Sequence, residues 1–222
     1  MMPTMRSTLI LVSVLVFVFH SSAQNPEEIQ ELIEFHILDC NNQLNTNQAY
    51  INQAGDGNDI TVIQQNTGII SNIVFSEQVS GGNIGYIEQT GDAHLTVLNQ
   101  SGQENEANIW SEGSLTYTQV EQFGSGNMVN SYIDNDGLLP KAALLQQNGN
   151  NNVIDFALLG NGCLWNSWPK GAYIKQTGDN LEVTALFDSY QSPVYIEQQS
   201  GAGGGMKINV STTAFSFPMK KF

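Results

Sequence analysis

A step of eleven residues is the feature of this sequence that most restricts its fold. Gln89, Gln100, Ser111, Gln122 and Ile133 stand at that spacing. Two positions after each of the first four stands a glycine: Gly91, Gly102, Gly113 and Gly124. Three positions after each glycine stands a polar residue: His94, Asn105, Thr116 and Asn127. A spacing held over four steps without an insertion indicates that the chain copies one small structural unit.

The unit is predicted to be two short β-strands joined by a tight arc. Even steps along a strand place side chains on one face. Even steps forward from Asn105 reach Ala107, Ile109 and Ser111, and even steps back from Gln100 reach Leu98, Thr96 and His94. The link around Gly102 is too short for a helix, and glycine permits the positive φ that a tight arc needs. Two steps, about 22 residues, make one coil, and stacked coils form two facing parallel sheets, a β-solenoid.

Inward-facing amides suit such a stack. A buried amide without a partner costs a few kcal/mol. When an identical amide lies one rung away, each can donate to one neighbour and accept from the other, as in the Asn and Gln ladders of cross-β assemblies. The repeat keeps like above like, so interior Gln and Asn are tolerated.

Seven copies lie between residues 47 and 210. They predict an all-β solenoid of about seven strand–arc–strand repeats with two stacked parallel sheets. The glutamine that opens each arc stands at 53, 78, 100, 122, 147, 176 and 198 or 199. The residues expected to form ladders and arcs are Gln53, Gly55, Asn58, Gln64, Gln78, Asn83, Gln89, Gly91, Gln100, Gly102, Asn105, Gln122, Gly124, Asn127, Gln147, Gly149, Asn152, Gln176 and Gly178.

The copies are not all alike. Extra residues occur between expected strands, where a solenoid tolerates insertion; they lie at 66–70, 134–140 and 160–171. In the last copy the first strand fits an origin at Gln198 and the second an origin at Gln199, which predicts a bulge in or near residues 200–205. Leu181 replaces the asparagine of the sixth copy, and the closing position changes from Gln64 and Gln89 to Ser111, Ile133, Leu158 and Phe187. The later copies are therefore expected to have a more apolar core.

Residues 1–23 have the form of a secretory signal peptide. Arg6 supplies the positive charge, residues 9–19 the apolar run, and Ser21–Ala23 a small-residue cleavage site. A transmembrane anchor is disfavoured because the apolar run is too short to span comfortably. We therefore expect cleavage before Gln24 and a secreted, extracellular chain.

Two further segments flank the repeats. Residues 24–46 are acidic and contain a stretch from Pro26 that predicts a short amphipathic helix. This segment is either a cap or export-recognition element or a frayed polar leader. Residues 211–222 form a basic tail that contains Lys220 and Lys221, and Lys207 lies just before it. These three lysines are expected to contact an anionic surface. The alternative is a solvated tail that blunts an open sheet edge.

Composition argues against several functions. Aspartate and glutamate number 21 against 7 lysines and arginines, which disfavours a nucleic-acid partner. An enzyme is not expected, because the mature chain has only His36 and His94 as histidines and no visible nucleophile–base set. No cofactor or metal is expected. The turn at 55–60 resembles a calcium β-roll repeat, but that motif needs tandem nine-residue copies.

Aromatic and cysteine residues leave alternatives open. Trp165, Trp168 and Tyr173 cluster in and beside the third insertion. They could stack on sugars or on a neighbouring subunit, or they could cover the flank of the solenoid. Cys40 and Cys163 could pair in an exported chain, or remain free or intermolecular thiols.

The pattern Ser/Asn-x5-Gln-x-Gly-x-x-Asn-x-Ala/Ile-x3-Gln resembles the curlin repeat of bacterial curli, the functional amyloid of biofilm matrix. The resemblance covers roughly residues 47–210. Its best matches are Asn47, Gln53, Gly55, Asn58, Ile60 and Gln64, and Gln100, Gly102, Asn105 and Ala107. The acidic N-terminal segment differs from the Gly/Asn-rich leader that is typical of the major curli subunit.

The resemblance implies a structural subunit or nucleator of extracellular, curli-like amyloid fibres. Coils would stack end to end, and the fibre, a cell-surface pilus, would act in adhesion and biofilm. The implied partners are the chain itself, other curlin-like subunits, and an outer-membrane curli secretion channel with its accessory factors. The basic tail, imperfect copies and insertions look more like the nucleator. The alternative hypothesis is a non-assembling secreted β-solenoid adhesin that binds surface glycans.

Overall fold

The computed structural model describes residues 46–135, 141–160, 171–187, 195–200 and 205–211, and every structural statement below concerns those residues. All their regular elements are β-strands. They include no helix of the length and apolarity needed to cross a membrane. Several sequence predictions fall outside these ranges: the signal peptide, the helix from Pro26, both cysteines, Trp165, Trp168, Lys220 and Lys221.

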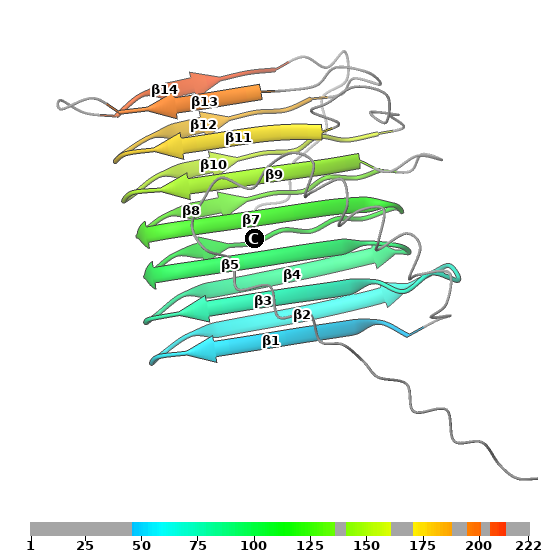
Figure 1. The fold of residues 1–222 in the computed structure, drawn as a ribbon. Coiled ribbons are helices and arrows are strands. Elements are labelled where there is room, and N and C mark those ends of the chain that lie inside the picture. Colours follow the sequence, from blue (N-terminus) through cyan, green and yellow to red (C-terminus); the bar gives the residue numbers. More distant parts are fainter. Residues whose placement is uncertain (1–45, 136–140, 161–170, 188–194, 201–204, 212–222) are drawn as a thin grey trace, which may run out of the picture.

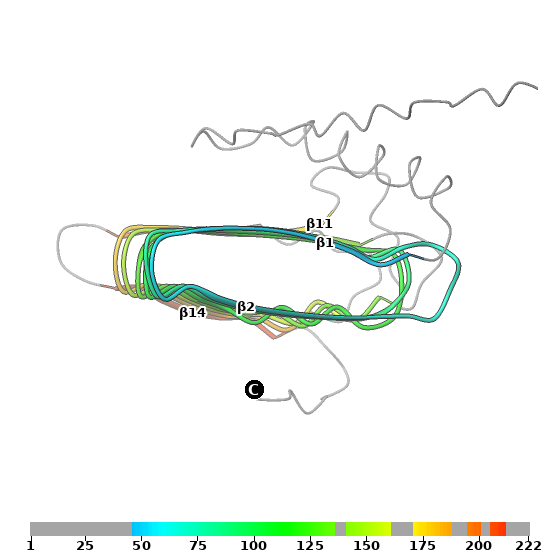
Figure 2. The same ribbon diagram turned by 90° about the horizontal axis from the view of Figure 1, so that it is seen from below.

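Fourteen strands form two parallel sheets of seven that face each other, as Figures 1 and 2 show. The odd sheet contains β1 (Gln48–Ala54), β3 (Ile73–Val79), β5 (Leu95–Gln103), β7 (Thr116–Ser125), β9 (Lys141–Asn148), β11 (Gly171–Thr177) and β13 (Tyr195–Gln199). The even sheet contains β2 (Asp59–Asn66), β4 (Ile84–Gly91), β6 (Glu106–Ala107), β8 (Met128–Asn130), β10 (Val153–Asp155), β12 (Glu182–Thr184) and β14 (Lys207–Asn209). The predicted all-β solenoid of seven strand–arc–strand units is confirmed.

The strand register keeps equivalent residues of successive copies side by side. In the odd sheet the arc glutamines pair in one unbroken column: Gln53, Gln78, Gln100, Gln122, Gln147, Gln176 and Gln198. The insertions fall at strand ends or between strands: the first begins with the last residue of β2, the second precedes β9, and the third ends with the first residue of β11. A solenoid accepts them there because they leave the pairing intact.

The core lies between the sheets and is built from columns of apolar side chains. Two such columns are fully buried: Leu98, Val120, Leu145 and Ile174 in the odd sheet, and Ala107, Val129, Ile154 and Val183 in the even sheet. Full burial of side chains the size of valine or leucine stabilises the fold by about 1.5–3 kcal/mol each. Later copies add large apolar groups at the closing end, including Phe156 and Phe187, whose rings meet edge to face at 5.9 Å.

The second strand of each unit is shorter than the repeat predicts in all but two copies. β2 and β4 have eight residues each, whereas the other even strands have two or three. In the third copy Ile109 and Ser111 are buried as predicted, but they do not belong to the strand. The backbone of Ile109 turns into the left-handed region, with φ of 46°, which ends the strand after Ala107.

The last copy takes its origin at Gln198, which pairs with Gln176 and is buried. Lys207 pairs with Glu182, so Met206 stands at the position of Leu181. The arc from Gln198 to Met206 therefore spans eight residues, against five from Gln100 to Asn105. The extra length of this arc accounts for the different origins that the two strands of the last copy indicate in the sequence. The bulge was predicted in or near residues 200–205, of which 201–204 lie outside the described ranges.

A second apolar cluster lies on the outward side of the odd sheet. Leu95, Val97, Tyr117 and Leu144 are buried there, with Tyr173 packed against them. Side chains on the same outward face at the two ends of the sheet are exposed, Phe75 and Tyr195 among them. The outward face is thus apolar in the middle of the stack as well as aromatic at its ends.

Candidate functional site: amide ladders and open ends

The arc glutamines form one continuous hydrogen-bonded ladder through all seven copies. Each side-chain Nε2 donates to the Oε1 of the next glutamine towards the C-terminal end. The six bonds are Gln53 to Gln78 (2.6 Å), Gln78 to Gln100 (2.7 Å), Gln100 to Gln122 (2.8 Å), Gln122 to Gln147 (2.9 Å), Gln147 to Gln176 (2.9 Å) and Gln176 to Gln198 (2.7 Å). The ladder therefore has a direction.

The same amides also bind the facing sheet. The Nε2 of Gln100 donates to the carbonyl oxygens of Ile84 and Asn105, at 3.0 and 3.1 Å. Gln122 makes the equivalent bonds to Glu106 and Asn127. These bonds offset the cost of burying the amides, which would otherwise be about 1–3 kcal/mol for each unpaired group.

The asparagines that close the arcs form a second ladder, which runs in the opposite direction. The Nδ2 of each asparagine donates to the Oδ1 of the preceding one: Asn83 to Asn58 (3.1 Å), Asn105 to Asn83 (3.1 Å) and Asn127 to Asn105 (3.0 Å). A backbone N–H bond to the same Oδ1 accompanies each of these side-chain bonds. The backbone bonds continue in the next two copies, where Asn152 donates to Asn127 and Leu181 to Asn152. Leu181 ends this ladder because it has no side-chain acceptor.

The arc glycines hold the ladders at their spacing. All seven that the repeat singles out have positive φ: Gly55 (109°), Gly91 (104°), Gly102 (121°), Gly113 (71°), Gly124 (118°), Gly149 (132°) and Gly178 (119°). The arcs are in backbone contact from copy to copy, so that a Cβ built on Gly102 would lie 1.8 Å from the carbonyl oxygen of Gly124. Glycine is required here both by conformation and by space.

The closing ladder is short. Gln64 Nε2 donates to Gln89 Oε1 at 2.7 Å, and Gln89 donates to the Thr96 hydroxyl at 2.9 Å. The column continues as Ser111, Ile133 and Leu158, all buried.

The predicted surface residue Lys207 lies on β14 and forms an ion pair with Glu182 at 2.5 Å.

A third polar column lies at the beginning of the odd strands. Asn72 Oδ1 accepts from the backbone N–H of His94 at 3.1 Å, and Asn72 Nδ2 donates to the Gly91 carbonyl at 3.0 Å. Asn72 was missed in the sequence, although it stands six residues before Gln78, as Asn47 stands before Gln53. That spacing was the signal that could have found it.

Lys141 continues this third column and is buried. Its Nζ donates to the carbonyl oxygens of Leu159 and Gly160. Sequence reasoning missed this lysine because the insertion before it hides the repeat spacing. The two carbonyls give the buried amino group polar partners at the end of the coil.

His94 acts as a substitute for the asparagine of its column. Its Nδ1 lies 2.7 Å from the Thr116 hydroxyl, and its Nε2 lies 2.7 Å from the Thr90 carbonyl and 3.0 Å from the Gly113 carbonyl. These partners suit a neutral ring with the proton on Nε2. Burial lowers the pKa of His94 from its ordinary value of 6.5, outweighing the opposing effect of the carbonyls.

We expect the protein to become less stable as the pH is lowered, and part of this loss should come from the protonation of His94 in the unfolded chain. Because the folded-state pKa of His94 is lowered, the unfolded chain binds the proton more readily as pH falls below 6.5, and the free energy of unfolding decreases. His94→Asn should keep the two-sided bonding seen at Asn72 and remove this dependence. Urea unfolding at about pH 7.5 and pH 5.5 measures it. Equal losses in the wild type and the variant would contradict the assignment.

Both ends of the stack expose core side chains and strand edges. At the N-terminal end, β1 exposes Ile51, which points into the core space and is 47% exposed. At the C-terminal end, Met206, which stands at the position of buried Leu181, is exposed, and Ile196 is partly buried against the core. Figure 1 shows β1 and β2 at one end and β13 and β14 at the other. Among the described residues, each outermost strand pairs along one edge only.

The described ranges contain no group of three or more His, Cys, Asp and Glu residues placed to hold a metal ion. Comparison of the chain with protein-family models, with curated proteins and with solved structures found no match.

Proposed function

We propose that this chain is a structural protein that assembles into extracellular cross-β fibres by stacking its open ends, as a subunit or nucleator of curli-like amyloid. The observation that carries the proposal is the in-register parallel stack, with a glutamine ladder unbroken from Gln53 to Gln198 and, within the part of the chain that the structure describes, an unpaired strand edge at each end. Unpaired edges of this kind template another strand. Stacked amides are the side-chain pattern of cross-β assemblies.

The wider setting belongs to the same proposal. The signal-peptide pattern supports secretion, and the curlin-like repeat supports export through a secretion channel and placement at the cell surface in adhesion and biofilm. The exposed lysine of β14 supports contact with an anionic surface. Low positive charge supports the absence of a nucleic-acid partner.

Thioflavin T fluorescence with electron microscopy on residues 24–222 tests the proposal. Fibres that appear after a lag indicate a fibre-forming subunit. Weak self-assembly together with a shortened lag for an added curlin subunit indicates a nucleator. A stable monomer that does neither would overturn the proposal, and glycan binding by that monomer would favour the adhesin.

One matched pair of variants sharpens this test. Ile51→Lys places a charge among the exposed core side chains at the N-terminal end of the stack. We expect it to slow fibre growth at least about tenfold, since stacking would bury an unpaired charge. Ile63→Lys is the control, because Ile63 has nearly the same exposure, 49% against 47%, but its neighbours Val62 and Gln64 are the residues that face inward. Equal growth of the two variants would show that the open core takes no part in assembly.

A further inference from the structure

We propose that copies of this chain stack head to tail in a single register, with β13 and β14 of one copy on β1 and β2 of the next. In this register Gln198 lies on Gln53, Tyr195 on Tyr50 and Lys207 on Asp59. The inference rests on the proposed function, and it specifies the partner surface as the opposite end of a second copy. Four independent properties of the two ends agree on it.

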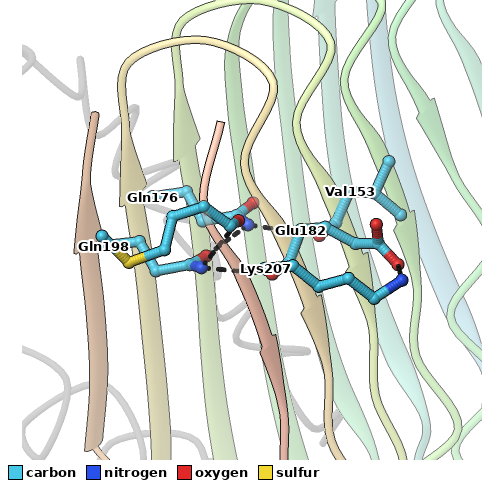
Figure 3. A network of polar contacts seen from close by, with 6 residues as sticks. Val153, Gln176, Glu182, Gln198 and Lys207 are labelled. Atoms are coloured by element: carbon cyan, nitrogen blue, oxygen red, sulfur yellow. Dashed lines mark hydrogen bonds and ion pairs between the residues drawn. The ribbon is translucent and has the colours of Figure 1, made fainter. Parts of the chain in front are cut away.

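The first property is the direction of the glutamine ladder. At the C-terminal end, Gln198 Nε2 donates to the carbonyl oxygens of Glu182 and Met206, at 3.1 and 3.2 Å. Among the described residues it has no amide acceptor, whereas every earlier member of the ladder has one. Figure 3 shows this end, with Gln176 bonded to Gln198. At the other end, no described residue donates to the Oε1 of Gln53.

This polarity excludes symmetric contacts. Head-to-tail stacking brings the donor of Gln198 to the acceptor of Gln53 and continues the ladder at its own spacing. A head-to-head contact would oppose two Oε1 acceptors, and a tail-to-tail contact would oppose two donors. A head-to-tail interface leaves the same two ends free after each addition, so it generates an open filament.

The second property is a column on the outward face of the odd sheet, three residues before each arc glutamine, whose two members at each end of the stack are aromatic. Tyr50 stacks on Phe75 at 4.9 Å with an interplanar angle of 10°, and Tyr173 stacks on Tyr195 at 5.3 Å with 15°. The register places Tyr195 on Tyr50, which are 60% and 51% exposed in the single chain. A third stacked pair then forms between copies.

The third property is charge. On the outward face of the even sheet one column begins with Asp59 at one end and finishes with Lys207 at the other. Inside the chain Lys207 already pairs with Glu182 on one side (Figure 3). In the stack Asp59 of the next copy comes to its other side, so that a lysine lies between two carboxylates.

The fourth property is the core, where the register places apolar side chains on apolar side chains. The pairs are Ile196 on Ile51, Ile208 on Ile60 and Val210 on Val62. A slip of one residue would turn every inward side chain outward. A slip of two would set Ile196 on Gln53 and Lys207 on Thr61, which forfeits the amide, aromatic and charge matches together.

Disulfide formation within fibres tests the register. The parent variant is Cys40→Ser with Cys163→Ser, which removes both native thiols. Tyr50→Cys and Tyr195→Cys are added together, fibres are grown under reducing conditions and then oxidised, and non-reducing gels are run. Neighbouring strands are about 4.8 Å apart, within the Cα separation that a disulfide allows. We expect covalent dimers and longer multimers.

The matched control replaces Tyr50→Cys with Asn52→Cys, which lies on the same face two residues away. Its Cα would be roughly 8 Å from that of residue 195, beyond disulfide reach, and its cross-linked yield should be at least about tenfold lower. Stronger cross-linking of the control would overturn the register. Covalent dimers from Tyr50→Cys alone would overturn the polarity. If the parent variant forms no fibres, the proposed function itself fails, which is a distinct result.

Discussion

Replacing Gln122 with alanine is expected to destabilise the folded chain by about 3–5 kcal/mol, one of the two largest effects of a single substitution that we predict. Gln122 is fully buried at the centre of the ladder. It accepts from Gln100 and donates to Gln147, and it also donates to two carbonyls of the facing sheet. Its removal takes one of three acceptors from the Nε2 of Gln100, leaves the buried Oε1 of Gln147 without its donor, and opens a cavity between the sheets.

Urea unfolding of the monomer, followed by circular dichroism, measures this effect. Gln103→Ala is the matched control, because Gln103 ends β5 with an exposed side chain. Surface substitutions of this kind stay within about 0.5 kcal/mol. A Gln122→Ala variant as stable as the control would show that the ladder contributes nothing to the fold of the single chain.

Gly102→Ala is expected to cost at least about 3 kcal/mol, from backbone strain and a clash acting together. The φ of Gly102 is 121°, a conformation that residues with a Cβ rarely adopt. The added Cβ would meet the Gly124 carbonyl oxygen at 1.8 Å and its carbon at 2.8 Å. The contact is with the backbone of the next arc, so relief requires the two coils to separate.

Gly57→Ala separates the two causes. Gly57 also has positive φ, 73°, but the nearest atom to its added Cβ is 3.7 Å away. It should therefore cost only about 1–2 kcal/mol, the penalty of the left-handed conformation. The same urea unfolding compares the two variants. Equal losses would mean that the close contact between arcs has no energetic weight.

The architecture and the positions of the ladder residues were predictable from the sequence. A β-solenoid is nearly one-dimensional, because each coil contacts only the coils before and after it. The eleven-residue step therefore predicts strand parity, as at Leu98 and Val120, and it predicts the arc glycines. The second strands were predicted less well, since their length depends on the local backbone at residues such as Ile109.

The bonding of the candidate site was less predictable than its position. Counting residues places Gln100 above Gln122, but it does not say that the glutamine and asparagine ladders donate in opposite directions. Nor does it place Lys141 against two carbonyls, because a seven-residue insertion precedes it. Counting residues also does not place Lys207 in the column that begins with Asp59, because the arc of the last copy is longer than the others.

The sequence by itself determined the repeat, the two faces of each strand, the arc positions and the stacking of like on like, because all of these follow from local spacing. Only the tertiary structure decided where the even strands end, which outward side chains are buried, and how each amide proton is shared. Those properties arise between coils, where insertions of different length change which atoms meet. The tertiary structure also decided which side chains stand at equivalent positions at the two ends of the stack, because this depends on the register of all the strands from β1 to β14.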